Sequence, residues 1–451
     1  MKYTTTIAAV VAASASTVLG DAQQINGNWY SSAVERIVFT DWGQAGTYSK
    51  VTDMSNGQCT KEQVSFSGGM SPLDGEVSWH FRGPMHLKQF AFYTPGSSSA
   101  KRWVKPNSSE RRHGHGHQER AVGDIVTATI NGQVVTWANN YGGAAAATPA
   151  PSASSVGVAA APAAAPSKAA QSSSAPKVEK NSSIPVVNAG AGNWGRQAYY
   201  NAESTTADGL VFLNNMGGQG SGVFDNNMGN SLSYMAADTK SGSASEQVLA
   251  DTLIEDNTEV IIYSDKPCDG DSCGAHRPGT VAYHGFDGEN KLFLLEFDMP
   301  MSGKTGWNMD MPAAWMLNAA IARTEQYGDC SCWGSGCGEW DVFEVLDSGN
   351  HRAISAIHAG AMSGTETHYF ERPVSKTIKA AVVFDGANSS GQVIVLSDDT
   401  NFDAVLADDI VAQFGTKPAG QGVLAGAARI AGEVGDMVEK LTATFKLGSF
   451  S

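Results

Sequence analysis

The sequence predicts an all-β protein of the sandwich type. Gly occupies 50 of the 451 positions and charged residues make up only 17%, a balance typical of loop-rich extracellular β proteins. Apolar residues recur in short runs bounded by turn residues, as sandwich strands do. A hydrophobic share of 42% supplies a sizeable core. The length suits about two folded units plus tails.

Residues 1–20 have the pattern of a secretory signal peptide. Lys2 precedes an apolar stretch from Ile7 to Val18 that is too short to span a bilayer, and small residues follow near Gly20. A buried N-terminal helix is the alternative, but the stretch has no amphipathic period. We therefore expect a secreted protein. We expect no membrane anchor, because the segment around Lys440 and Lys446 lacks the apolar tail of a lipid-anchor signal.

Residues 21–142 are predicted to form a β-rich N-terminal domain. Val77, Trp79 and Phe81 alternate with polar neighbours, as in a half-buried strand. Residues 125–130 and 133–137 flank an Asn-Gly pair, which predicts a β-hairpin. The histidines at 113, 115 and 117 could bind a metal ion, but no cysteine or carboxylate completes a coordination shell. We interpret them as a solvated loop and expect no metal site.

Residues 143–183 consist mainly of Ala, Ser and Pro, which cannot bury a core, and we interpret them as an extended linker. Three Asn-Ser-Ser sequons, at Asn107, Asn181 and Asn388, are candidate glycosylation sites in an exported chain. The linker places a domain boundary before the C-terminal part.

Residues 184–451 are predicted to form the catalytic domain. Its expected strands lie at 260–263, 281–283, 291–297 and 380–384, and residues 313–327 have a helical pattern.

Six cysteines in an exported protein are expected to form disulfides. Cys268 and Cys273 enclose a short polar turn and should pair with each other. Cys330, Cys332 and Cys337 form a second cluster with an odd member. Parity therefore favours a bridge from the isolated Cys59 into the C-terminal half.

The net charge of -15 excludes the usual footprint of nucleic-acid binding, which requires a basic surface. The same charge disfavours anionic membranes. A neutral polymer is the partner that fits best.

The segment 339–346, Glu-Trp-Asp-Val-Phe-Glu-Val-Leu, carries the most specific chemical signal. Three carboxylates occur within six residues of an otherwise apolar strand, and such groups are costly to desolvate. In a regular strand Glu339 and Asp341 share one face while Glu344 lies on the other. A β-bulge at residues 342–343 would bring Glu344 to the same face. A Ca²⁺ site or a solvent-facing acidic strand is the alternative, but Ca²⁺ sites prefer Asp- and Gly-rich loops.

Two carboxyl groups at the spacing of such a bulged strand are typical of retaining glycosidases. We assign Glu339 as the nucleophile and Glu344 as the general acid/base, with Asp341 tuning the charge of Glu339 between them. No Ser, metalloprotease or nucleotide-binding motif competes with this assignment.

These residues carry a family resemblance. Glu-x-Asp-x-x-Glu is similar to the bulged signature of glycoside hydrolase family 16, and residues 311–317, Met-Pro-Ala-Ala-Trp-Met-Leu, resemble the segment that precedes it. Residues 353–360 resemble the following strand, which implies a role near the acid/base for His358. The cysteine-rich segment, the Tyr-His-Gly-Phe at 283–286 and the Arg-Gly-Pro at 82–84 resemble fungal cell-wall proteins described as probable circularly permuted 1,3-β-glucanases.

The resemblance implies a concanavalin-like jelly roll, retaining endo-hydrolysis of β-1,3-glucan, residence in the cell wall and no cofactor. A transglycosylase would use the same residues. A non-catalytic glucan-binding wall protein is the other alternative.

Several tryptophans are candidates for stacking on sugar rings, because pyranose faces are apolar. We expect stacking by Trp315 and core packing by Trp340, which alternation turns away from the carboxylates. Trp307 and Trp333 are further candidates for substrate binding, and for them the choice between stacking and packing stays open.

Overall fold

The computed structural model describes residues 22–96 (except 41, 43, 44 and 56), residues 189–416 (except 271, 360–363 and 366), and the strands at 125–130, 133–138 and 423–425. The predicted signal peptide and linker, and the sequons at Asn107 and Asn181, lie outside these residues. The hairpin is confirmed: β8 (Ile125–Ile130) and β9 (Gln133–Ala138) pair antiparallel, with Ile130 opposite Gln133.

The first sheet of the fold has nine strands. In spatial order these are β11 (Thr206–Asp208), β10 (Asn193–Asn201), β7 (His86–Pro95), β18 (Lys291–Asp298), β24 (Ile378–Asp385), β25 (Ser390–Leu396), β3 (Arg36–Phe39) and β27 (Val423–Ala425), and β26 (Val405–Ala407) also pairs with β10.

The second sheet has ten strands. Their order is β16 (Gly242–Ser243), β15 (Ser233–Met235), β12 (Leu210–Asn214), β17 (Glu259–Ser264), β6 (Val77–Arg82), β19 (Ala313–Asn318), β20 (Glu339–Glu344), β21 (Arg352–His358) and β22 (Gly364–Thr365), and β23 (Phe370–Glu371) also pairs with β21.

The remaining elements are three hairpins and a few helical segments. Three hairpins stand beside the sheets: β1 (Gln23–Ile25) with β2 (Asn28–Tyr30), β4 (Gly46–Ser55) with β5 (Gln58–Phe66), and β13 (Phe224–Asp225) with β14 (Gly229–Asn230). The helices are α1 (Ala320–Arg323), α2 (Asp408–Thr416) and the 3₁₀ turn η1 (Trp333–Ser335). None of the helices in the described part of the chain has the length and apolar character needed to cross a bilayer.

The two large sheets pack face to face around one core, which confirms the β-sandwich. Phe92 of β7 and Phe293 of β18 belong to the same buried cluster as Trp79 of β6 and Phe343 of β20. Alternation along β6 sends Trp79 into this core and His80 to the opposite face of the ten-stranded sheet. The core therefore fixes which side chains that outer face presents.

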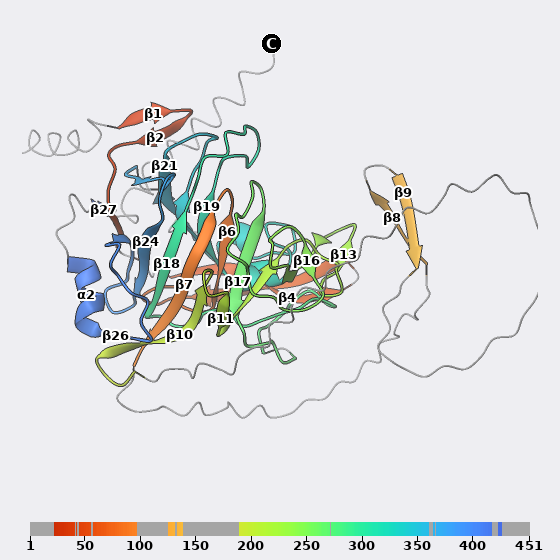
Figure 1. The fold of residues 1–451 in the computed structure, drawn as a ribbon. Coiled ribbons are helices and arrows are strands. Elements are labelled where there is room, and N and C mark those ends of the chain that lie inside the picture. Colours follow the sequence, from red (N-terminus) through yellow and green to blue (C-terminus); the bar gives the residue numbers. More distant parts are fainter. Residues whose placement is uncertain are drawn as a thin grey trace, which may run out of the picture. The chain divides into compact units, whose positions relative to one another are not determined.

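The predicted separate N-terminal domain over residues 21–142 is corrected by the sheet topology. β6 pairs with β17 and β19, and β7 pairs with β10 and β18, so strands on both sides of the predicted linker share the two sheets. Figure 1 shows the orange β6 and β7 lying among green and blue strands of the C-terminal part. Local strand patterns carry no information about partners, and here the partners lie about a hundred residues or more away in sequence.

Two local predictions are also corrected. Residues 313–318 form a strand and only Ala320–Arg323 is helical, because the Ala-Ala-Trp-Met-Leu run is buried on both sides, against the core and against the outer-face cluster. Residues 281–283 contribute a single bridge to Pro267 rather than a strand. Asn388 lies exposed in the turn between β24 and β25, which leaves it accessible as a sequon.

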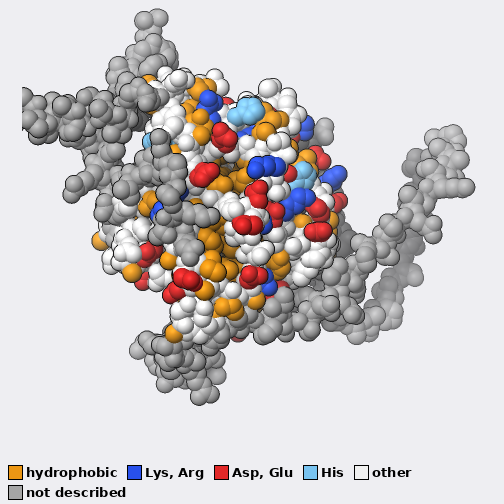
Figure 2. Space-filling view, turned by 60° about the vertical axis from the view of Figure 1, so that its left-hand side comes forward, with side chains coloured by type: hydrophobic (Ala, Val, Ile, Leu, Met, Phe, Trp, Pro, Cys, Tyr) orange, Lys and Arg blue, Asp and Glu red, His pale blue; other side chains and the backbone are white. Residues whose placement is uncertain are grey.

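All six cysteines are paired, as Cys59–Cys330, Cys268–Cys273 and Cys332–Cys337. The local pair and the bridge from Cys59 into the C-terminal half are thereby confirmed. On the surface that Figure 2 shows, acidic and basic side chains are interspersed, with hydrophobic atoms exposed between them.

Candidate active site

Strand β20 is bulged at the predicted position. Its pairing with β21 shifts register between Asp341 and Glu344. Val342 and Phe343 are both buried in the core between the sheets, and Glu344 returns to the outer face that carries Glu339 and Asp341. The bulge therefore gathers the three carboxyl groups on one side of the strand.

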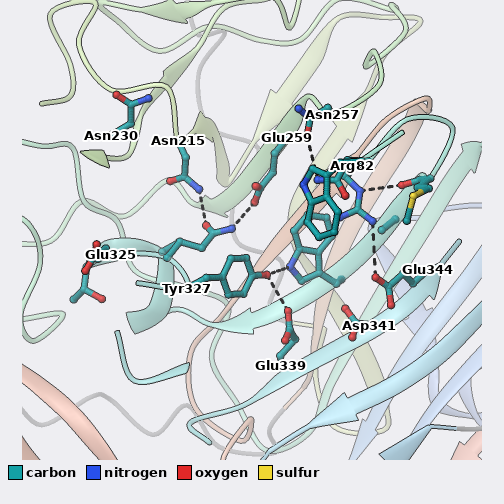
Figure 3. Close-up of a pocket in the computed structure, with 18 of the residues that line it drawn as sticks. Arg82, Asn215, Asn230, Asn257, Glu259, Glu325, Tyr327, Glu339, Asp341 and Glu344 are labelled. Carbon is teal, nitrogen blue, oxygen red and sulfur yellow. Dashed lines mark hydrogen bonds and ion pairs between the residues drawn. The ribbon is translucent and has the colours of Figure 1, made fainter. Parts of the chain in front are cut away.

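The three carboxyl groups line a cavity of about 570 Å³ on the outer face of the ten-stranded sheet. Figure 3 shows the polar side chains that converge on it from β6, β17, β20 and the loop after α1. The lining residues are Arg82, Asn215, Met228, Asn230, Ser231, Asn257, Glu259, Trp307, Asn308, Met311, Ala313, Trp315, Ala322, Thr324, Glu325, Gln326, Tyr327, Glu339, Asp341 and Glu344.

Two aromatic donors hold the carboxyl group of Glu339. The Tyr327 hydroxyl donates to its Oε1 at 2.9 Å, and the Trp333 indole Nε1 donates to its Oε2 at 2.6 Å. Trp315 Nε1 in turn donates to the Tyr327 hydroxyl at 2.9 Å. Burial and the neighbouring Asp341 raise the pKa of Glu339 to about 7, against the effect of the two hydrogen bonds, which favour the ionised form. Its two oxygens are thus fixed in orientation.

The loop between α1 and β20 positions these donors. Tyr327 has a φ of +60°, a conformation that non-glycine residues rarely adopt. Trp333 lies within the ring closed by the Cys332–Cys337 disulfide. Gly338 enters β20 with a φ of +113°, where a Cβ would lie 2.7 Å from the Leu73 side chain. Only glycine tolerates both this positive φ and the close approach of Leu73 at the residue before Glu339.

The β4–β5 hairpin supports this loop from behind. Cys59 of β5 is bridged to Cys330, the Ser49 backbone N–H donates to Ser335 Oγ at 2.9 Å, and Lys61 Nζ donates to the Ser331 carbonyl at 2.9 Å. The β4–β5 hairpin therefore holds the loop that carries Tyr327 and Trp333.

Glu344 has a different environment. Its Oε1 lies 3.8 Å from Arg82 Nη2, and Arg82 is held by its Nε donating to the Met311 carbonyl at 2.9 Å. Burial, followed by the charge of Asp341, raises the pKa of Glu344 to about 8, and Arg82 only partly opposes this. Burial and the nearby carboxylate of Asp341 therefore favour the protonated form of Glu344.

Asp341 is 7% exposed and faces His358 of the neighbouring strand. His358 Nε2 lies 3.1 Å from Asp341 Oδ2, and this contact raises the pKa of the imidazole. Asp341, His358 and Glu339 offer ligand atoms within 4.8 Å of one another, so these residues could hold a metal ion. His358 therefore contacts Asp341 and is not among the residues that line the cavity.

The tryptophans divide by burial. Trp340 is fully buried and packs edge-on against Trp42, as alternation predicts. Trp315 is only 5% exposed and stacks on His80 with ring centroids 5.2 Å apart, so it forms part of the cavity floor. Trp307 is 83% exposed at the rim, and Trp333 is bound to Glu339.

Sequence reasoning missed several polar residues of the site, among them Arg82, Glu259, Gln326 and Tyr327. Arg82 and Glu259 could have been found from their polar positions at the end and the start of apolar strands. Gln326 and Tyr327 lie in a loop without periodicity, so their sequence positions carry no such signal.

The fold and the site together define a class. The cavity on one sheet of the β-sandwich is lined by carboxyl groups. One of them is held by two donors, and the pKa of a second is raised. This is the organisation of a glycoside hydrolase. The chain matches two family models, described as the N-terminal (residues 35–95) and C-terminal (residues 192–414) families of the cell wall protein YJL171C/Tos1.

Curated relatives agree with these matches. The chain is 42% identical to a probable circularly permuted 1,3-beta-glucanase of Arthroderma benhamiae, over 88% of this chain and 93% of the relative. It is 38% identical to the protein of that description named TOS1 in Candida albicans, over 91% and 97% of the two chains. Identity to the Saccharomyces cerevisiae TOS1 protein is also 38%, over 89% and 94%. The chain belongs to this family of fungal cell wall proteins. No solved structure matches it.

Proposed function

We propose that the protein is a secreted, retaining endo-β-1,3-glucanase that acts in the cell wall. One observation supports this most directly: a single bulged strand places Glu339, Asp341 and Glu344 in one cavity, with Glu339 held by two donors and Glu344 next to Arg82. The relatives are named as probable 1,3-β-glucanases, which supports the glucan linkage.

In the proposed reaction, Glu339 attacks the anomeric carbon while Glu344 donates its proton to the departing glycosidic oxygen. A covalent glycosyl-enzyme forms and the glycosidic bond breaks. Glu344, now ionised, takes a proton from water, and the resulting hydroxide equivalent releases the sugar from Glu339. The donors on Glu339 fix the orientation of its carboxylate, and burial together with the charge of Asp341 keeps Glu344 protonated until the sugar binds.

The charge of the cavity supports a neutral substrate. Five carboxyl groups and one guanidinium line it among the described residues, so an anionic polysaccharide would be repelled. The exposed Trp307 supplies an apolar platform at the rim for a sugar ring, and Trp315 supplies a flat floor.

A transglycosylase would share each of these residues and differ in whether water or a sugar hydroxyl enters at the second step. A non-catalytic wall protein has no need of two donors on one buried carboxyl group. Product analysis on laminarin, following reducing ends and chain lengths together, separates the three functions.

Glu339→Gln and Glu344→Gln should each lower turnover of laminarin more than about a hundredfold, because each removes a group that takes part in bond making or breaking. Asp341→Asn should have a smaller effect. Thermal unfolding of each variant provides the folding control. A glutamine variant that keeps more than about a hundredth of the wild-type activity would refute the assignment.

The stereochemistry of the first product tests the mechanism separately. Attack by Glu339 followed by attack of water inverts the anomeric carbon twice, so proton NMR should show the β anomer first. An initial α anomer would mean direct attack by water and would exclude Glu339 as nucleophile.

A further inference from the structure

The cavity contains a second polar cluster, away from the strand that carries the proposed catalytic residues. It consists of Glu259 at the start of β17, Gln326 in the loop after α1, and Asn215 after β12, and we call it the Glu259 cluster. Figure 3 shows Asn215 and Glu259 on the side of the cavity away from Glu344, and hydrogen bonds join both residues to Gln326. None of them has a role in the reaction described above.

The hydrogen bonds of the Glu259 cluster leave one carboxylate oxygen for a ligand. Glu259 Oε1 lies 2.7 Å from His80 Nδ1 and accepts from Gln326 Nε2 at 2.9 Å. Asn215 Nδ2 donates to Gln326 Oε1 at 2.6 Å and fixes that amide. Among the described residues no hydrogen bond ends on Glu259 Oε2, although the residue lines the cavity.

The support behind Glu259 is rigid. His80 is fully buried, its Nε2 lies 2.8 Å from Ser78 Oγ, and its ring stacks beneath Trp315. Because an ionised carboxylate only accepts, His80 Nδ1 carries the proton directed at Glu259. A carboxylate held on one oxygen by two fixed donors presents its other oxygen in a defined direction, as recognition of a hydroxyl group requires.

The strand pairings separate the backbone of Glu259 from that of Glu344 across the ten-stranded sheet. The strand pairings align Glu259 with Arg82, Arg82 with Ala313, and Ala313 with Glu344. Three strand spacings of about 4.8 Å place the backbones of Glu259 and Glu344 roughly 14 Å apart. β6 and β19 therefore lie between the strand that carries Glu259 and the strand that carries the proposed catalytic residues.

We propose that the Glu259 cluster is a distal subsite that binds the hydroxyl groups of a neutral glucosyl unit at least one residue away from the cleaved bond. Glu259 Oε2 accepts a hydrogen bond from the sugar, and the amides of Gln326 and Asn215 frame it. This rests on the proposed function for the identity of the polymer. Adjacent residues Gln326 and Tyr327 then link the distal subsite to Glu339, since one holds Glu259 and the other holds the nucleophile.

Binding to an inactive protein tests the subsite without requiring turnover. In the Glu339→Gln background, Glu259→Gln should weaken the binding of laminarihexaose about tenfold by calorimetry, because it removes a charge-assisted hydrogen bond. Binding of laminaribiose, too short to span the cavity, should be unchanged. Glu255→Gln is the matched control, since Glu255 lies just before the same strand with its side chain 53% exposed.

Asn215→Ala should also weaken hexaose binding, but by less. This second variant keeps the proposal testable if the Glu259→Gln protein does not fold. Equal affinity of the Glu259→Gln and Glu255→Gln proteins for the hexaose would overturn the subsite. So would an equal loss of affinity for the two sugar lengths. If the wild type cleaves no β-glucan while hexaose binding still depends on Glu259, the proposed function fails and the subsite stands.

Discussion

Replacing Tyr327 by Phe tests how the site controls its proposed nucleophile. The change removes one hydroxyl, which donates to Glu339 Oε1 at 2.9 Å and accepts from Trp315 Nε1 at 2.9 Å. A hydrogen bond to a charged group contributes about 1.5–3 kcal/mol. At about 1.4 kcal/mol per pKa unit, its loss should raise the pKa of Glu339 by roughly 1–2 units. The direction follows because the hydroxyl stabilises only the ionised carboxylate.

The effect of the Tyr327→Phe change on activity also depends on the neighbouring acid, Glu344. The pKa of Glu339 is raised to about 7 and that of Glu344 to about 8, and turnover requires the first ionised and the second protonated. Activity should therefore follow a bell in which the acidic limb reports Glu339 and the alkaline limb Glu344. In the Tyr327→Phe protein the acidic limb moves toward the alkaline one. Activity at about pH 6 should then fall roughly ten- to hundredfold.

The assay is the pH dependence of kcat/KM on laminarin for the wild type and the variant. Tyr199→Phe is the control, because it removes a hydroxyl that donates to Gln89 on the other sheet. A Tyr327→Phe protein with reduced activity but an unshifted acidic limb would refute the argument, since the hydroxyl would then not act through the ionisation of Glu339.

Two further predictions concern stability and the disulfide-closed loop. The pKa of Glu344 is higher in the folded than in the unfolded protein, so the wild type loses stability as the pH rises from about 4.5 to about 8. The Glu344→Gln side chain cannot ionise. The thermal midpoint of this variant, relative to that of the wild type, should therefore increase over the same pH range. A constant difference across the range would contradict the buried, protonated state of Glu344. Replacing Cys332 and Cys337 by Ala should lower kcat on laminarin about tenfold, because the ring that aims Trp333 at Glu339 is opened. Removing the Cys268–Cys273 pair is the control, and an equal loss in both variants would argue against a specific role for Trp333.

The sequence contained the local parts of this site. The three carboxylates, the bulge between them and the inward face of Trp340 follow from alternation along one strand and from the cost of burying charge. The pairing of Cys268 with Cys273 follows from their spacing. Each of these needs only the side chains of a short segment.

The parts that escaped prediction depend on contacts distant in sequence. Arg82 approaches Glu344 only because β6 pairs with β19, and β19 with β20. Tyr327 contacts Glu339 because it adopts a left-handed backbone conformation within its loop. No feature of the local sequence predicts that conformation. The run at 313–318 has helix-forming residues, but burial on both sides of a central strand overrides that propensity.

The central placement of β6 and β7 bears on how the chain is made. Ribosomes deliver residues 77–95 early, yet the strands that flank them begin at residues 193, 259, 291 and 313. Both edges of the apolar strands β6 and β7 therefore stay unpaired until most of the polypeptide has been synthesised. Strands that pair over long sequence distances fold slowly, and until then their unpaired edges can hydrogen-bond to other chains. Truncation before β19 would leave β6 without one neighbour, so partial products should aggregate rather than persist as folded fragments.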